Sequence, residues 1–182
     1  MKIAYHVSDP RKSQLIMYVG GEGGTGKSRI INCVTALFEE IDPDGLHKMA
    51  FTGTAAYNIG GRTIHSSIRK TKGSRRKKIE KESDLRHKES NRSFWKTKTC
   101  AIVDEITFAP EAIMNDHHNV LCSAKGISDT DGPQNPFGGM HVIMFGDFFQ
   151  HLAIGKRIYE SFLWNRLTNS LILTEQVRAK DD

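Results

Sequence analysis

The chain has few cysteines and no long apolar stretch. Its 182 residues include only three cysteines, an odd number at wide spacing, which does not suit a disulfide framework. We therefore expect Cys33, Cys100 and Cys122 to be reduced, buried thiols of an intracellular protein. No apolar stretch approaches the roughly 20 residues needed to cross a bilayer. We expect a soluble chain with no membrane partner.

The N-terminus also lacks the apolar core and the small-residue cleavage site of a secretory signal, which argues against secretion. The length suffices for one ordinary hydrophobic core and leaves no room for a second full domain. We therefore expect residues 1–182 to form a single domain.

Positive charge is concentrated in one segment. Residues 69–98 contain 13 Lys/Arg against 4 Asp/Glu, an excess of +9, whereas the whole chain carries +5, which leaves −4 for the rest. Apolar residues are scarce there until Phe94 and Trp95, so the segment is predicted to be an exposed, partly flexible insertion. A basic stripe favours a polyanion such as nucleic acid. A solvated linker and a nuclear-import signal are the alternatives.

A complete Walker A signature, G-x-x-x-x-G-K-[ST], runs from Gly21 to Ser28. Glycines allow the backbone to turn tightly and aim N–H groups at phosphate oxygens. Lys27 can reach the β- and γ-phosphates, and the Ser28 hydroxyl can bind Mg²⁺. The predicted nucleotide-binding residues are Gly21, Gly23, Gly24, Thr25, Gly26, Lys27 and Ser28.

Strands alternate with helices along the chain, which predicts a mostly parallel α/β sheet flanked by helices. The predicted strands are residues 15–19, 48–52, 100–103, 142–145 and 170–173, and the predicted helices follow the Walker A motif, lie between Gly53 and Gly61, and span 110–124. Residues 128–139, rich in Gly, Pro, Asp and Asn, are predicted to be a loop.

Two acids follow the buried strand that starts at Cys100. An apolar strand that ends in acids after a Walker A motif is typical of Walker B, at the edge where ligands bind in such sheets. We expect Asp104 to hold Mg²⁺ and Glu105 to orient and deprotonate the attacking water.

Two polar residues follow later strands. Gln150 comes after the fourth predicted strand and could contact the γ-phosphate and the attacking water, or could simply be a polar cap. Arg178 follows the fifth and could reach developing negative charge, although an arginine so near the end of the chain is often only solvated.

These motifs resemble those of the Pif-type (petite integration frequency) DNA helicases, and especially their Helitron-associated fungal relatives. The similarity covers five blocks in the family's order: Gly20 to Ser28, Phe51 to Ser66, Asp104-Glu105, Pro136 to Gln150, and Leu173 to Arg178.

The resemblance implies the first RecA-like P-loop NTPase domain of an ATP- and Mg²⁺-dependent helicase that moves 5′ to 3′ along single-stranded DNA. It implies γ-phosphate contacts at Gln150 and Arg178, and DNA-backbone contacts at Thr54, Asn58, Thr63 and His65. It also implies a nuclear and mitochondrial location and roles in DNA repair, recombination, the DNA damage response and telomere maintenance.

The chain departs from the family pattern in several places. His151-Leu152-Ala153 stands where the family usually has Leu-Pro-Pro, the gap from Tyr159 to Trp164 is short, and neither the adenine-reading glutamine motif nor motifs V and VI are present. We therefore expect a truncated chain that binds nucleotide without unwinding DNA.

Two other functions remain open at this stage. A P-loop kinase would share the Walker A motif and the parallel sheet, but a lid and an acceptor pocket are not recognisable. A non-catalytic nucleic-acid-binding module, such as a mobile-element remnant, would use the basic segment without turnover.

Overall fold

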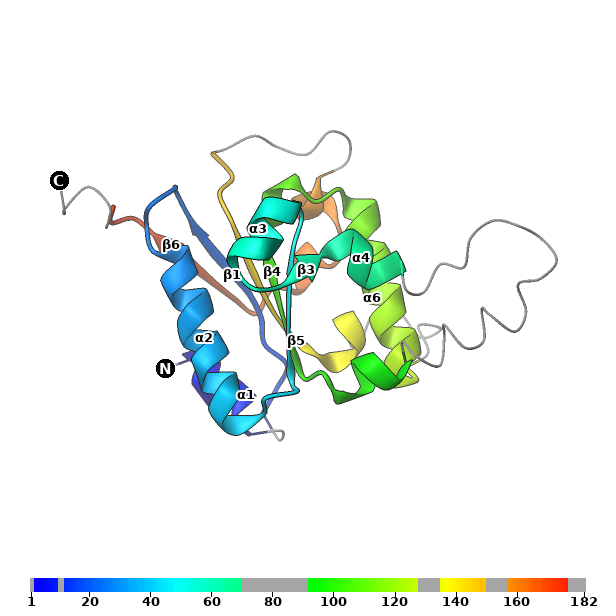
Figure 1. The fold of residues 1–182 in the computed structure, drawn as a ribbon. Helices are drawn as coiled ribbons and strands as arrows, with labels where there is room; N and C mark the ends of the chain where they lie inside the picture. The colour runs from blue at the N-terminus through cyan, green and yellow to red at the C-terminus, as the bar shows by residue number, and fades with distance from the viewer. Residues whose placement is uncertain (1, 10–11, 70–91, 128–134, 150–156, 177–182) are drawn as a thin grey trace.

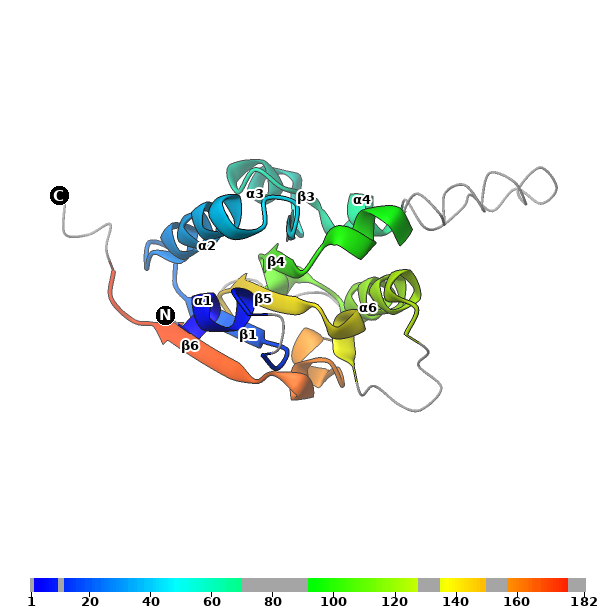
Figure 2. The same ribbon diagram turned by 90° about the horizontal axis from the view of Figure 1, so that it is seen from below.

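Figure 1 shows the computed structural model of the chain, which describes residues 2–9, 12–69, 92–127, 135–149 and 157–176. The six strands are β1 Ile16–Gly21, β2 Leu46–Ala50, β3 Arg62–Thr63, β4 Cys100–Asp104, β5 His141–Gly146 and β6 Asn169–Leu173. They pair in parallel in the order β3-β2-β4-β5-β1-β6. The predicted parallel α/β sheet is therefore confirmed, and β6 forms one of its edges (Figure 2).

Helices connect the strands on both sides of the sheet, and Figure 1 shows α2 and α6 on opposite sides. The α-helices are α1 Lys2–Val7, α2 Lys27–Ile41, α3 Gly53–Asn58, α4 Ile64–Arg69 and α6 Glu111–Lys125, and residues 92–97 are also helical. The 3₁₀ turns are η1 Ile106–Phe108, η3 Pro136–Gly139, η4 Ile158–Glu160 and η5 Trp164–Arg166. None of the helices in these described stretches is long and apolar enough to cross a membrane.

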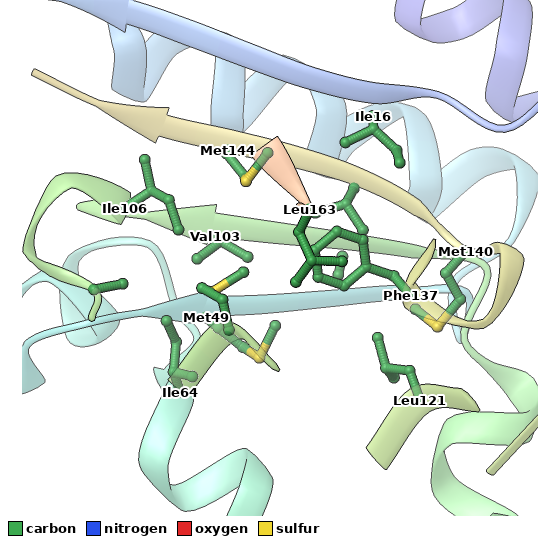
Figure 3. Packing of buried hydrophobic residues seen from close by; sticks show 14 of the residues in the cluster. Ile16, Met49, Ile64, Val103, Ile106, Leu121, Phe137, Met140, Met144 and Leu163 are labelled. Carbon is green, nitrogen blue, oxygen red and sulfur yellow. The ribbon is translucent and has the colours of Figure 1, made fainter. Parts of the chain in front are cut away.

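The central strands are apolar on both faces because helices cover both. Along β5, Val142 and Met144 face one cluster of buried side chains, and Ile143 and Phe145 face the other. The first cluster packs against α4 and α6 (Figure 3). The second packs against α2 and α3. Such continuous apolar strands are typical of parallel sheets buried on both faces.

Several elements differ from the sequence prediction. The second strand ends at Ala50, two residues before its predicted end, and α1, β3 and α4 were not predicted. The last predicted loop residues, Pro136–Gly139, form a 3₁₀ turn in which Phe137 has a positive φ of 55°. Residues 128–134 of that loop lie outside the described residues.

Two burial predictions also need correction. Cys33 is exposed, whereas Cys100 and Cys122 are buried as expected, and all three are free thiols. Cys33 sits on the outer face of α2, whose buried residues are Ile31, Val34 and Phe38.

Trp95, near the end of the segment predicted to be exposed, is only 1% exposed. An indole ring buries a large apolar area, which outweighs the charge of its neighbours in the sequence. Residues 70–91 of the predicted basic insertion lie outside the described residues.

Candidate nucleotide site and nucleic-acid surface

The Walker A loop joins the carboxyl end of β1 to the N-terminus of α2. Gly24 and Gly26 have φ angles of 88° and 96°, which residues with a Cβ rarely adopt. Gly26 is the N-cap residue of α2. The positive end of the α2 dipole therefore lies at the Walker A loop, beyond the carboxyl end of β1. A helix N-terminus in this position favours the binding of an anion.

Glycine is also required at position 21, because other atoms approach its backbone closely. A Cβ at Gly21 would lie 2.5 Å from Thr25 Oγ1 and 3.0 Å from Leu173 Cβ. The Thr25 hydroxyl donates to the Glu22 carbonyl oxygen at 2.8 Å, which closes the turn. The tight curl of the predicted phosphate loop thus depends on glycine at this position.

The Lys27 ammonium bonds to the loop itself. It donates to the carbonyl oxygens of Gly21 and of Glu22, the latter at 2.9 Å. Ser28 follows on the first turn of α2 and is exposed. Both side chains thus lie at the start of α2, just beyond the carboxyl end of β1.

Asp104 ends β4 and is partly buried. Its pKa is raised, first by burial and then by the nearby Glu105 carboxylate, while the Glu105 backbone N–H and the Lys27 ammonium oppose the rise. That N–H donates to Asp104 Oδ1 at 2.9 Å. Asp104 ends β4 and Lys27 follows β1, and these two strands are the neighbours of β5 in the sheet.

Glu105 has an unusual backbone conformation for a residue with a side chain. Its φ is 54° and its ψ is 39°, in the left-handed region. Its Oε2 accepts a hydrogen bond from Thr52 Oγ1 at 2.6 Å. Strained non-glycine residues of this kind cluster at functional sites.

A cleft of about 260 Å³ lies beside the phosphate loop. Its walls come from three places: the loop, the residues after β5, and the end of β6. Asp147, in the second wall, is buried, and its Oδ1 accepts from the Phe149 N–H at 3.0 Å. Gln176 Nε2, beyond β6, donates to Glu22 Oε2 at 3.1 Å.

Two predicted catalytic residues, Gln150 and Arg178, lie outside the described residues, as does the His151-Leu152-Ala153 departure. Their γ-phosphate roles therefore stay predictions.

The four predicted DNA contacts lie on neighbouring elements. Thr54 and Asn58 are exposed on α3, and His65 is exposed on α4. Thr63, in β3, is half-buried, and its Oγ1 accepts from the Ser66 N–H at 3.2 Å. This hydroxyl thus caps α4, which leaves the other three side chains as the more accessible candidates.

Sequence reasoning missed Thr52 as part of the site. Thr52 is the N-cap of α3, and its Oγ1 accepts from the Ala55 N–H at 3.2 Å. A threonine before a helix is a recognisable capping signal. Its contact with Glu105 depends on the pairing of β2 with β4, which no local pattern predicts.

The donors fit a magnesium-bound nucleoside triphosphate. Ser28 and Asp104 carry oxygen ligands of the kind that Mg²⁺ prefers. The tight glycine-rich loop and the N-terminus of α2 suit a phosphate group. Together with the parallel sheet, they define the class of protein as a P-loop NTPase with a RecA-like fold.

The chain belongs to the PIF1-like helicase family, whose family model matches residues 3–182. It is 28% identical over 186 residues to the ATP-dependent DNA helicase RRM3 of Saccharomyces cerevisiae, covering 94% of this chain and 24% of that protein. It is 30% identical over 137 residues to the ATP-dependent DNA helicase PIF1 of Trypanosoma brucei brucei, covering 74% of this chain and 12% of that protein. The chain therefore spans a quarter or less of these relatives.

Solved structures agree with this assignment. The crystal structure of Pif1 helicase from Candida albicans superposes with a TM-score of 0.70 at 27% identity, covering 93% of this chain and 38% of that one. Pif1 helicase from Bacteroides, crystallised with ADP-AlF3 and ssDNA, also gives a TM-score of 0.70, covering 97% of this chain and 41% of that one. At 24% identity the second match supports the fold alone.

Proposed function

We propose that this chain is the first RecA-like domain of an ATP-dependent DNA helicase that moves 5′ to 3′ along single-stranded DNA. The observation that carries the proposal is the phosphate loop and the acid pair at one edge of a parallel sheet, in a chain of the PIF1-like helicase family. The relatives RRM3 and PIF1 are named ATP-dependent DNA helicases, which supports ATP and DNA as ligands.

In this proposal each residue of the nucleotide site has a separate task. Lys27 exchanges its bonds to loop carbonyls for bonds to phosphate oxygens, and Ser28 and Asp104 hold Mg²⁺. The bound ion would neutralise charge that develops on the phosphates. Glu105 orients the attacking water and accepts its proton. Gln150 and Arg178 are proposed to contact the γ-phosphate.

The DNA would run over α3, β3 and α4. Thr54, Asn58, Thr63 and His65 are the proposed backbone contacts, and the basic residues of the 69–98 sequence are proposed to attract the DNA phosphates. Contacts to phosphate give affinity without sequence preference. A nuclear and mitochondrial location, and roles in repair, recombination, the damage response and telomere maintenance, are part of the same proposal.

Translocation requires two RecA-like domains that open and close on the nucleotide. The 182-residue chain is therefore expected to bind nucleotide weakly and to unwind little or no DNA.

Nucleotide titration tests the proposal. The chain should bind Mg²⁺-ATP, Lys27→Ala should abolish binding, and Lys12→Ala, a lysine that instead lies 4.3 Å above the Tyr5 ring, should bind normally. Retained affinity in Lys27→Ala would contradict the phosphate-loop assignment.

Turnover assays separate the alternatives. ATP hydrolysis stimulated by single-stranded DNA supports a helicase domain, whereas phosphate transfer to nucleosides would indicate a kinase. A non-catalytic DNA-binding module would show no turnover, and its DNA affinity would fall steeply with salt and survive Glu105→Gln.

A further inference from the structure

The Thr52 hydroxyl joins two parts of the molecule that have different proposed ligands. It donates to Glu105 Oε2 at 2.6 Å, a short bond typical of a charged acceptor. Its lone pairs accept from the Ala55 N–H at 3.2 Å, which caps α3. A hydroxyl has one proton and two lone pairs, so both bonds form at once. Glu105 is thus tied to the first turn of α3.

The strand order shows toward which side of β4 the hydrogen bond from Thr52 draws the Glu105 side chain. β4, which ends just before Glu105, has β5 on one side and β2 on the other, and β1 with the phosphate loop lies beyond β5. Thr52 follows β2. The bond therefore draws the Glu105 carboxylate toward the side of β4 that faces away from the phosphate loop.

The backbone of Glu105 supports the same conclusion. Its left-handed conformation, with φ 54° and ψ 39°, is unfavourable for a residue with a Cβ. Such a conformation persists only where surrounding contacts hold it. Release of the side chain would remove one of the contacts that hold it.

We propose that Thr52 is a positioning residue that holds Glu105 away from the attacking water until single-stranded DNA binds to α3. The inference rests on the proposed function, because it gives Glu105 the role of orienting water. Thr54 and Asn58, the proposed DNA contacts, lie on the helix that Thr52 caps. Two states are in equilibrium, one with Glu105 bonded to Thr52 and one with this bond broken. DNA that binds more tightly to the second state would shift the equilibrium toward it.

The test compares two ligands in the 182-residue chain, each with and without an oligo(dT) strand. Mg²⁺-ADP-aluminium fluoride mimics the transferring phosphoryl group and the attacking water, whereas Mg²⁺-ADP lacks both. In the wild-type chain, oligo(dT) should tighten the fluoride complex about tenfold, within the usual range of coupling between sites, and leave Mg²⁺-ADP unchanged. In Thr52→Val, the fluoride complex without DNA should be as tight as the wild-type complex with oligo(dT).

Further variants separate the bond to Glu105 from the helix cap. Thr52→Ser keeps both bonds and should behave as wild type. Thr52→Asp keeps the cap but repels Glu105, so it should match Thr52→Val. Thr97→Val removes an exposed hydroxyl that donates to the Phe94 carbonyl oxygen, near the opposite end of β4, and should change nothing.

Three results would overturn the inference while Mg²⁺-ADP binding remains intact. The affinity for the fluoride complex without DNA would be unchanged in Thr52→Val, it would be lower in Thr52→Val, or it would rise in Thr52→Val and not in Thr52→Asp. A wild-type chain that fails to bind Mg²⁺-ADP, or binding that Lys27→Ala leaves unchanged, would instead overturn the proposed function and the inference with it.

Discussion

The candidate nucleotide site and the buried aromatic region near α6 use polar side chains in opposite ways. The first region, which we call the nucleotide edge, consists of residues 21–28, 52–53, 104–105 and 147–149. At the nucleotide edge, Lys27 and Glu105 carry charge, are partly exposed and have hydrogen-bond partners. Beside α6, His117 is fully buried, and neither of its ring nitrogens has a partner among the described residues. The charged groups of the first region are partly open to solvent, whereas the second region is closed by packing.

We call the second region the ring cluster. It consists of His47, Phe94, Trp95, His117, His118 and Phe137. Trp95 lies 4.8 Å from His47 and 5.6 Å from His117 between ring centroids, both in edge-on contacts. These rings come from β2, the helix at 92–97, α6 and η3, so the cluster joins four parts of the chain.

The largest expected effect is a difference in the free energy of unfolding between a substitution in each region. Trp95→Ala removes a fully buried ring and should lower the free energy of unfolding by about 3–5 kcal/mol. Phe149→Ala removes an equally apolar ring that is 92% exposed in the cleft beside the phosphate loop, and should change it by about 0.5 kcal/mol or less. Denaturant unfolding of both variants measures the difference. Equal losses would mean that the ring cluster is not part of the core.

The next effect concerns pH. Burial, with smaller contributions from His47 and His118, lowers the pKa of His117 from 6.5 to about 3. The unfolded chain therefore binds an extra proton in this interval, and stability should fall as pH falls from 6.5 toward 3, by up to about 1.4 kcal/mol per pH unit. His117→Phe keeps a ring and removes the titration.

Unfolding free energies at pH 7 and pH 5 test this. Burial also lowers the pKa of His141, with His6 as the second cause, so part of the slope should survive in His117→Phe. A slope identical to that of the wild type would show that His117 does not titrate between the two states.

The placement of the loop residues at the nucleotide edge was largely predictable because they are adjacent in the sequence. Gly26, Lys27 and Ser28 follow one another in the chain, and a loop that must turn tightly requires glycine wherever it appears. Asp104 was predictable for a related reason, since four small apolar residues before it indicate a strand buried on both faces.

The ring cluster was not predictable, because its members are far apart in the sequence. Trp95 follows a long basic stretch, and it is buried by residues that are distant in the sequence, such as His47 and His117. β3 has two residues and exists through its pairing with β2. The exposure of Cys33 could have been predicted, since the apolar spacing of Ile31, Val34 and Phe38 leaves it on the opposite face of α2.

The smallest expected effect comes from replacing one glycine in each region with alanine. The change in the free energy of unfolding should have opposite signs in the two variants. Gly126 ends α6, which carries the ring cluster, and its φ of 70° is left-handed. A Cβ there meets only Arg92 Nη2 at 3.6 Å, an ordinary contact, so Gly126→Ala should cost about 1–2 kcal/mol through backbone strain alone.

Gly53 begins α3 at the nucleotide edge without a positive φ, and a Cβ there meets nothing within 4 Å. Gly53→Ala should therefore stabilise the chain by about 0.4–1 kcal/mol, because alanine restricts the unfolded chain more than glycine does. Thermal and denaturant unfolding of the two variants would show opposite shifts. A loss in both would mean that α3 needs the freedom of glycine at its first residue, as a helix that moves when DNA binds would.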